Sequence, residues 1–357
     1  MTRARARADI GKLGGNIADS AGKARGTVIS VVIPVFQSAA HLARCLDALA
    51  TSTLAPLETI VVDDGSTDGS GEIARRANAV VVGVPNGPRG PAVARNLGAA
   101  HARGDILFFL DADVAVHPDT LAEMSSCLEA HADVAAVFGS YDARPDHVST
   151  VSQYRNLLHH HLHQRGRREA STFWAGCGAI RRQVFEQLGG FDERYTRPSI
   201  EDIELGVRLR AAGHRIWLRP EIQVTHLKRW TFAEIVWSDV ADRAIPWTRL
   251  ILDRAHLPQD LNTSMTSRVS AVAAWTAVGA LAVGFVRPRA LWVGVLAGTV
   301  VFVLNAGLYR FFLRTRGVAF AAAAAGMHTL YLLYSSAVFG VLAVGARLPG
   351  SRRPPAL

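Results

Sequence analysis

Two aspartates, Asp111 and Asp113, are separated by one alanine directly after the apolar run Ile106 to Leu110. A short apolar run that is bounded by turn residues is typical of a buried strand in a parallel sheet. In open α/β sheets, ligands bind at the carboxyl ends of the strands, where these two carboxylates would stand. Carboxylate oxygens, shared with substrate phosphates, are the donors that Mg²⁺ and Mn²⁺ prefer. The pair therefore indicates either a divalent-cation site or a solvated acidic turn.

A second acidic pair, Asp63 and Asp64, follows the strand pattern that begins at Glu58. A carboxylate at a strand end can accept a hydrogen bond from a pyrimidine base or from a ribose hydroxyl. The ordinary alternative for one of the two is a turn residue. The next helix would be capped by Ser66, Thr67 or Asp68.

The elements that must position these carboxylates alternate along residues 28–110. Strands are predicted over residues 28–34, 58–62, 79–82 and 106–110, and helices lie between them, the last at 91–102. This alternation predicts an α/β fold with a doubly wound, mostly parallel sheet and right-handed crossovers. Neither a G-x-G-x-x-G after the first strand nor a P-loop motif is present, so the usual signals of dinucleotide oxidoreductases and P-loop ATPases are missing. Arg95, in the predicted helix at 91–102, would neutralise a diphosphate or form a surface ion pair.

Four short motifs in this order carry a family resemblance. They are Val-Val-Ile-Pro at 31–34, Val-Asp-Asp-Gly-Ser-Thr-Asp at 62–68, Ala-Arg-Asn-Leu-Gly at 94–98 and Leu-Asp-Ala-Asp at 110–113. Together they resemble family 2 glycosyltransferases over residues 27–230. The resemblance implies a GT-A fold, a nucleotide-sugar donor, and Mn²⁺ or Mg²⁺ as cofactor.

The resemblance also implies roles for individual residues. Asp63 and Asp64 would contact the base and ribose, Asp113 would bind the metal and diphosphate, and Asp111 would support the sugar or its ribose. UDP is the favoured donor nucleotide, with GDP and others left open. The remaining donor-binding residues would be Pro34, Val35, Arg95 and Gly176.

The stretch Phe173 to Ile180, which contains Gly176, is rich in small residues and is followed by a helix predicted to begin at Arg181. Small residues permit a ligand to approach the backbone closely, although tight packing explains them equally well. In the family this stretch lies beneath the donor sugar.

A predicted helix opens at Ser199 and carries Glu201 and Asp202. Ser199 as N-cap would make Asp202 part of a capping box, which is a purely structural role. The family resemblance instead implies that Asp202 is the catalytic base of an inverting transferase, with Glu201 close to the acceptor or diphosphate. Such a base removes the proton of the acceptor hydroxyl while the anomeric carbon is attacked.

The domain ends at His226-Leu-Lys-Arg229-Trp230. This resembles the Gln-x-x-Arg-Trp motif of processive synthases, but His226 replaces the glutamine, which argues against long-chain synthesis. His226 is expected to be a metal ligand, a diphosphate contact or a partly buried polar residue. Arg229 and Trp230 would close the site on the acceptor or diphosphate side.

Three apolar segments without charged residues follow at about 269–286, 290–309 and 318–345. A membrane-spanning helix needs about 20 apolar residues, so these segments predict about three transmembrane helices rather than buried helices of a soluble protein. Residues 231–265 are expected to form amphipathic helices at the membrane interface, broken near Pro246, with Trp237 and Trp247 in the aromatic belt.

The predicted organisation has five parts. They are a disordered basic segment 1–26, a GT-A domain 27–230, interface helices 231–265, a transmembrane region 266–346 and a tail 347–357. The net charge of +9 suits anionic lipid headgroups, and no motif supports nucleic-acid binding. Cys45, Cys127 and Cys177 form no disulfide or zinc pattern, and the histidines at 159–163 are expected in a loop.

The sequence thus predicts a multi-pass membrane enzyme whose catalytic domain is cytoplasmic, because no signal peptide precedes it. It would be an inverting, metal-dependent, non-processive glycosyltransferase that moves one hexose-type sugar to a lipidic or cell-envelope acceptor. A polyprenyl phosphate, a glycolipid and a carotenoid-like alcohol all remain open as acceptors. The alternatives are a processive polysaccharide synthase and a non-catalytic, nucleotide-sugar-binding membrane scaffold.

Overall fold

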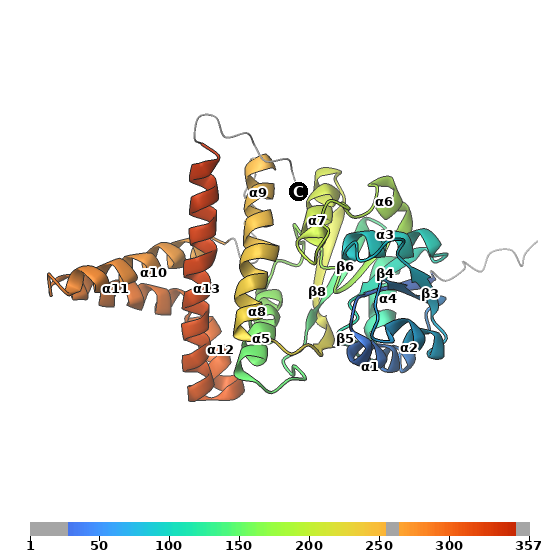
Figure 1. Cartoon of the computed structure of the whole chain (residues 1–357), viewed down its shortest axis with the longest axis horizontal. Coiled ribbons are helices and arrows are strands. Elements are labelled where there is room, and N and C mark those ends of the chain that lie inside the picture. The colour runs from blue at the N-terminus through green and yellow to red at the C-terminus, as the bar shows by residue number, and fades with distance from the viewer. Residues whose placement is uncertain (1–27, 255–263, 348–357) are drawn as a thin grey trace, which may run out of the picture.

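The computed structural model describes residues 28–254 and 264–347. An α/β domain holds all the strands, and a group of helices lies beside it (Figure 1). The predicted basic segment 1–26 and nearly all of the predicted tail 347–357 lie outside the described residues.

The α/β domain is built on one eight-stranded sheet with the strand order β3-β2-β1-β4-β7-β6-β8-β5. The neighbours β3, β2, β1 and β4 are parallel, as predicted from the strand–helix alternation. The other half is mixed, because β7 and β5 run antiparallel to their neighbours whereas β6 and β8 are parallel. The strands are β1 (Ile29–Val35), β2 (Glu58–Asp63), β3 (Val80–Gly83), β4 (Ile106–Leu110), β5 (Val114–Val116), β6 (Val134–Tyr141), β7 (Cys177–Arg181) and β8 (Arg215–His226).

Helices cover both faces of this sheet, and each face has its own apolar core. One core joins α1 and α4 to the sheet, and the other joins α3, α6 and α7 to it. In β4, Phe108 faces the first core and Phe109 the second, so the strand is buried on both faces as its unbroken apolar run predicts. The helices are α1 (Ala39–Ala50), α2 (Ser70–Arg76), α3 (Pro91–His101), α4 (Thr120–Ala130), α5 (Thr150–Arg165), α6 (Arg182–Gln187) and α7 (Glu201–Ala211).

Residues Cys177–Arg181 form strand β7, which carries no strand pattern in the sequence. Two local expectations in this domain are wrong. The N-cap of α2 is Gly69, although the Asp68 carboxylate still accepts the Ser70 backbone N–H. The histidines at 159–163 lie within helix α5 rather than in a loop.

The helices after the domain begin with a continuous helical stretch. It comprises α8 (Phe232–Trp237), the π-helix η1 (Ser238–Ala244) and α9 (Ile245–Arg254). The predicted break near Pro246 is wrong: Pro246 is the second residue of α9. A proline has no N–H to donate, and the wider π-helical turn before it accommodates that loss.

The apolar helices are α10 (Met265–Gly284), α11 (Ala290–Leu304), α12 (Ala306–Arg316) and α13 (Val318–Gly345). Among the described residues, α10 and α13 are each long and apolar enough to cross a membrane. The predicted second span is divided at Asn305, where α11 and α12 meet at a bend of 68°, so the pair is one broken span or a re-entrant segment.

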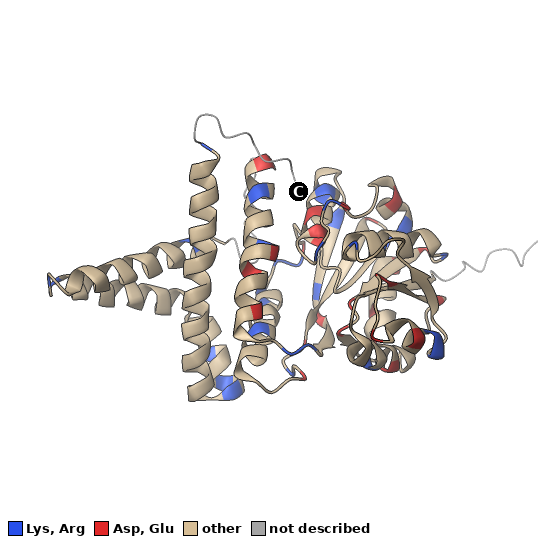
Figure 2. Ribbon diagram, viewed as in Figure 1, with Lys and Arg blue, Asp and Glu red and all other residues tan. Residues whose placement is uncertain are grey.

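The apolar helices run in two different directions (Figure 1). The antiparallel pair α10–α11 points away from the α/β domain, whereas α13 runs crosswise to it, alongside α9 (Figure 1). Arg268, near the start of α10, is the one charged side chain along the described residues of α10, α11 and α13, and the other charges gather on the α/β domain, α9 and α12 (Figure 2). Large apolar side chains such as Trp292, Leu296 and Val341 are exposed there. Exposed apolar surface of this extent is typical of contact with lipid.

Candidate active site

A single large cavity of about 2080 Å³ contains most of the predicted site residues. It begins at the carboxyl ends of β1 and β4, passes the start of α7, and reaches α9, α10 and α13. The site residues that line it are Pro34, Val35, Asp64, Arg95, Asp111, Asp113, Glu201, Asp202, His226, Arg229 and Trp230.

Arg95 joins the two halves of this site. Its Nη1 donates to Glu201 Oε1 at 2.6 Å and its Nη2 donates to Asp111 Oδ1 at 2.7 Å. Burial would lower the pKa of Arg95, but the two carboxylates outweigh it and raise that pKa. Arg95 therefore forms a buried ion-pair bridge, not the surface ion pair considered as its ordinary alternative, and its charge is already shared with two carboxylates.

Asp113 lies opposite His226, which is on the edge-strand pair β5–β8. His226 Nε2 is 3.5 Å from Asp113 Oδ2, and Nδ1 of the same ring is 2.7 Å from Asn156 Oδ1. With Nδ1–H donating to the amide oxygen, Nε2 faces Asp113, where it carries a proton when the ring is an imidazolium and a free lone pair when the ring is neutral. The Tyr141 ring stacks on the imidazole at 4.5 Å and fixes its plane. Burial would raise the pKa of Asp113, but His226 and Lys228 outweigh it and lower that pKa to about 2.

Asp202 is the second residue of α7. Its carboxylate accepts hydrogen bonds from the backbone N–H of Ala175 at 3.1 Å and of Ile203 at 2.8 Å. Burial and the neighbouring Glu201 raise the pKa of Asp202 to about 7, against the opposing effect of Arg95. The capping-box interpretation is wrong, because the N-cap is Ile200 and the Ser199 hydroxyl donates to the Asp242 carbonyl.

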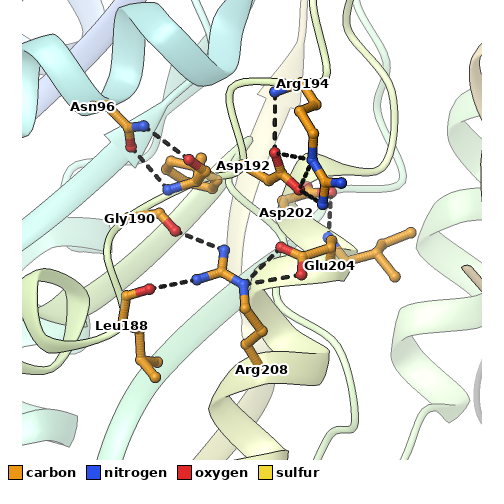
Figure 3. Close-up of polar contacts among 10 residues, drawn as sticks. Asn96, Leu188, Gly190, Asp192, Arg194, Asp202, Glu204 and Arg208 are labelled. Atoms are coloured by element: carbon orange, nitrogen blue, oxygen red, sulfur yellow. Dashed lines mark hydrogen bonds and ion pairs between the residues drawn. The ribbon is translucent and has the colours of Figure 1, made fainter. Parts of the chain in front are cut away.

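Helix α7 is bonded to the loop at residues 188–191, and the same loop is bonded to α3 (Figure 3). Arg208 pairs with Glu204 at 2.8 Å and donates to the carbonyls of Leu188 and Gly190. Asn96 of α3 both donates to and accepts from the backbone of Phe191. The loop before α7 is thereby held against α3 and α7, which limits movement of Asp202.

The structure places the carboxylates of the acidic pair Asp63 and Asp64 in different surroundings. Asp64 lines the cavity, and its carboxylate accepts the backbone N–H groups of Arg89 at 2.8 Å and Gly90 at 2.7 Å. Asp63 is outside the set of described residues that line the cavity, and its carboxylate accepts the Ser66 N–H at 2.8 Å. Gly176 is also outside that set, and a Cβ there would lie 2.7 Å from the Trp174 ring. Tight packing therefore accounts for this glycine.

Trp230 is enclosed by two cations. Lys228 Nζ lies 4.2 Å from its ring centroid and the Arg155 guanidinium lies 5.5 Å from it. Arg155 Nη1 also donates to Asp239 at 2.6 Å, and Tyr334 of α13 donates to the same carboxylate at 2.6 Å. This network ties α5 to η1 and to the apolar helices.

Several cavity residues were missed from the sequence. Asn156, Arg155 and Tyr141 come from α5 and β6, in the part of the domain where no motif was found. Arg243 comes from η1, where the amphipathic pattern gave it only an interfacial role. In the sequence, Arg155 and Asn156 are distinguished only by their closeness to the histidine cluster at 159–163, with which they share helix α5.

Residues 30–189 match the family described as Glycosyl transferase family 2. This match relates residues 30–189, somewhat less than half of the chain, to the family 2 glycosyltransferases. Residues 156–230 also match the model described as the N-terminal domain of galactosyltransferase. The two matches together cover the β1–β8 sheet.

Two curated relatives illustrate the similarity. The glycosyltransferase is 28% identical over 251 residues to the succinoglycan biosynthesis protein ExoA of Rhizobium meliloti, covering 64% of this chain and 75% of ExoA. It is 34% identical over 222 residues to validoxylamine A glucosyltransferase of Streptomyces hygroscopicus subsp. jinggangensis, covering 52% of each chain. Apart from ExoA, the chain spans about half or less of the length of the first relatives.

One solved structure has a similar fold over nearly the whole chain. It is the mannosyltransferase PcManGT from Pyrobaculum calidifontis in complex with GDP-Man and Mn²⁺. The TM-score is 0.52 at 21% identity, and the match covers 90% of this chain and 88% of PcManGT. The predicted GT-A fold with following apolar helices is thus confirmed.

Proposed function

We propose that this glycosyltransferase is an inverting, non-processive enzyme that moves one hexose-type sugar from a nucleoside diphosphate to a lipidic or cell-envelope acceptor at a membrane. The observation that carries the proposal is one cavity that holds Asp113, His226 and Asp202 and continues to the apolar helices α10 and α13. The donor chemistry and a membrane-bound acceptor can meet in such a space.

The donor would bind at the carboxyl ends of β1, β2 and β4. Asp64, with Pro34 and Val35, offers a carboxylate and backbone for the base and ribose, and UDP is the favoured nucleotide. Asp63 accepts the Ser66 N–H and so supports the turn after β2 that precedes Asp64 in the donor site. Asp111 stays oriented toward the sugar and ribose because Arg95 holds it.

Asp113 and His226 would hold Mn²⁺ or Mg²⁺. Their carboxylate oxygen and imidazole nitrogen face each other at 3.5 Å, and the bond from His226 Nδ1 to Asn156 leaves the other nitrogen available. The described residues contain no group of three or more His, Cys, Asp or Glu side chains placed to bind a metal, so substrate oxygens would complete the coordination. When bound, the cation would neutralise charge on the diphosphate leaving group.

Asp202 would act as the general base. A carboxylate oxygen of Asp202 takes the proton of the acceptor hydroxyl. At the same time the acceptor oxygen forms a bond to the anomeric carbon, and the bond from that carbon to the diphosphate breaks. One displacement of this kind inverts the anomeric configuration. A base is most effective when its pKa lies near the working pH. Burial is the main cause that raises the pKa of Asp202 to about 7. Glu201 raises this pKa while Arg95 limits the rise.

The acceptor would enter from the membrane side. Trp237 and Trp247 line the cavity from α8 and α9, as expected for interfacial helices that face both water and lipid. The proposed domains are the GT-A domain 27–230, the interface helices 231–265 and the membrane region 266–346, with the GT-A domain in the cytoplasm. Because α13 runs crosswise to α10–α11, the pair and α13 would occupy different orientations in the bilayer (Figure 1).

The test is nucleoside diphosphate release from a panel of nucleotide sugars by protein reconstituted with envelope lipid, with and without Mn²⁺. Release from one donor that requires both metal and lipid supports the proposal. Binding of nucleotide without any release would favour the scaffold alternative. Products that carry many sugars would favour the processive alternative, against which the replacement of glutamine by His226 argues.

A further inference from the structure

Arg243 lines the same cavity as Asp202 and the helices α9, α10 and α13. It belongs to η1, and its side chain is exposed although it lines the cavity. Burial and Arg155 lower the pKa of Arg243, while Asp239 and Asp202 oppose this. The guanidinium therefore lies among protein groups near the proposed base and faces the space of the cavity.

Arg243 has no fixed partner. Across residues 28–254 and 264–347 it makes no hydrogen bond and no ion pair within 4 Å. The nearby carboxylates are engaged elsewhere, since Asp239 accepts from Arg155 and Asp242 pairs with Arg197 at 3.0 Å. Arg243 therefore presents a positive charge to the cavity without a counter-ion among the described residues, and an anionic ligand could form charge-assisted hydrogen bonds with it.

Three other residues that line the cavity carry hydrogen-bond donors without an acceptor among the described residues. Arg155 Nη2, Asn156 Nδ2 and Trp230 Nε1 are buried and have no hydrogen-bond partner among the described residues. All three are donors, so the region is short of acceptor oxygens, which a phosphate supplies in number. These three are covered by protein atoms, whereas Arg243 presents its charge to the cavity directly.

The cavity wall formed by α9, α10 and α13 carries large apolar side chains among hydroxyl groups and one further arginine, Arg268. The large apolar side chains are Trp247, Ile251, Val272, Trp275, Leu332 and Phe339. An extended hydrocarbon chain fits such a wall, and the adjoining positive charge fits an anionic head group.

We propose that Arg243 binds the phosphate of a lipid acceptor whose hydrocarbon chain lies against α9, α10 and α13. This subsite rests on the proposed transferase function, because it gives the acceptor of that reaction its chemical class. Arg243 positions the acceptor by its phosphate, and Asp202 takes the proton from a hydroxyl carried beyond that phosphate. A phosphate oxygen is largely ionised at neutral pH and would itself need no base.

The experiment uses the full chain in phosphatidylcholine nanodiscs and follows tryptophan fluorescence, since Trp230, Trp237, Trp247 and Trp275 line the cavity. Dodecyl phosphate, dodecanol and inorganic phosphate are titrated separately. The variants are Arg243→Gln, Arg243→Lys and, as a matched control, Arg249→Gln on the adjoining helix, outside the described cavity lining. Melting temperatures verify that the variants are folded, which is expected because Arg243 has no partner to lose.

Dodecyl phosphate should bind at least about tenfold more tightly than dodecanol or inorganic phosphate. It combines a charge-assisted hydrogen bond to Arg243 with apolar contacts of its hydrocarbon chain, and each of the other probes offers only one of these. Arg243→Gln should remove this preference, Arg243→Lys should keep part of it, and Arg249→Gln should keep all of it. Equal binding of dodecanol, equal binding of inorganic phosphate, or an unchanged Arg243→Gln variant would each overturn it.

The subsite and the transferase proposal can fail separately. UDP and Mn²⁺ binding by Arg243→Gln should equal the wild type, because Asp64 and Asp113 are untouched. Arg243-dependent binding of dodecyl phosphate without nucleoside diphosphate release would leave the subsite standing and contradict the transferase chemistry. Release that is unaffected by Arg243→Gln at limiting lipid would contradict the subsite alone.

Discussion

His226 Nε2 faces Asp113 Oδ2 at 3.5 Å, while Nδ1 of the same ring is 2.7 Å from Asn156 Oδ1. The amide thus selects the imidazole tautomer whose free nitrogen points toward the carboxylate. Groups behind a metal ligand usually contribute to affinity in this way, by fixing both the proton and the ring plane.

Asn156→Ala should therefore weaken Mn²⁺ binding roughly 10–100-fold without loss of folding. The affinity is measured from the free Mn²⁺ signal in electron paramagnetic resonance with UDP present. Gln187→Ala, at an exposed position of α6, is the control and should bind Mn²⁺ as the wild type does. Unchanged affinity in Asn156→Ala would mean that His226 is not a metal ligand oriented by the amide.

The Arg95 bridge should be important for stability. Arg95→Ala leaves Glu201 and Asp111 as unpaired carboxylates, and Glu201 is only 4% exposed. Breaking a buried pair of this kind costs about 3–5 kcal/mol. Arg76→Ala, which removes a pair with Glu72 in which both side chains are exposed, should cost less than about 1 kcal/mol. Thermal unfolding of the two variants compares them, and equal losses would show that the bridge contributes no more than a surface pair.

The pH dependence of turnover should report Asp202. A base must be ionised to accept a proton, so kcat/KM should fall about tenfold per pH unit below the pKa of about 7 and level off above it. The profile is measured between pH 5.5 and 9 at saturating Mn²⁺, with Asp133→Asn on the domain surface as control. A profile that stays flat through about pH 7 would argue against Asp202 as the base.

The same raised pKa has a consequence for stability. Because the pKa of Asp202 is higher in the folded chain than its ordinary value of 3.8, the folded state holds the proton more tightly. This tighter binding of the proton stabilises the folded state at pH values below the ordinary pKa of 3.8. The stabilisation is lost as the pH rises toward about 7. Asp202→Asn should then melt at a higher temperature than the wild type at pH 8, and the difference should shrink toward pH 5. A difference that is independent of pH would contradict this environment for Asp202.

Membrane insertion should depend on α11. Leu296 is 67% exposed near the middle of that helix, and an arginine at the centre of a membrane helix costs roughly 2.5–3.5 kcal/mol. Leu296→Arg should reduce the membrane-bound fraction after carbonate extraction. Leu57→Arg is the control, because Leu57 is 46% exposed on the α/β domain. Equal extraction of the two variants would place α11 outside the bilayer.

The sequence predicted the parallel half of the sheet because that half is specified locally. Strand β4 is an unbroken apolar run, which indicates that it is buried. Strand β2 ends directly at Asp63, so the acidic residue marks its carboxyl end. Strand β7 was missed because its central residues, Gly178 and Ala179, are small and carry no strand pattern. Its pairing with β4 and β6 determines its structure.

The site could be predicted only where short motifs carry it. Asp113 and Asp202, which line the cavity, were predicted in this way. The partner of Arg95 is Glu201, 106 residues further along the chain. Periodicity and composition do not report such long-range contacts. The role of Asn156 behind His226 and the position of Arg243 in the cavity likewise depend on how α5 and η1 pack, which no local pattern encodes.

The most direct test of the central claim compares turnover and binding in Asp202→Asn. The variant should bind the donor nucleotide with Mn²⁺ as the wild type does, since Asp64, Asp113 and His226 are unchanged. Nucleoside diphosphate release with envelope lipid should fall about 10²–10⁴-fold, the usual contribution of a general base, while Asp133→Asn keeps wild-type release. Release by Asp202→Asn within a few fold of the wild type would contradict the account.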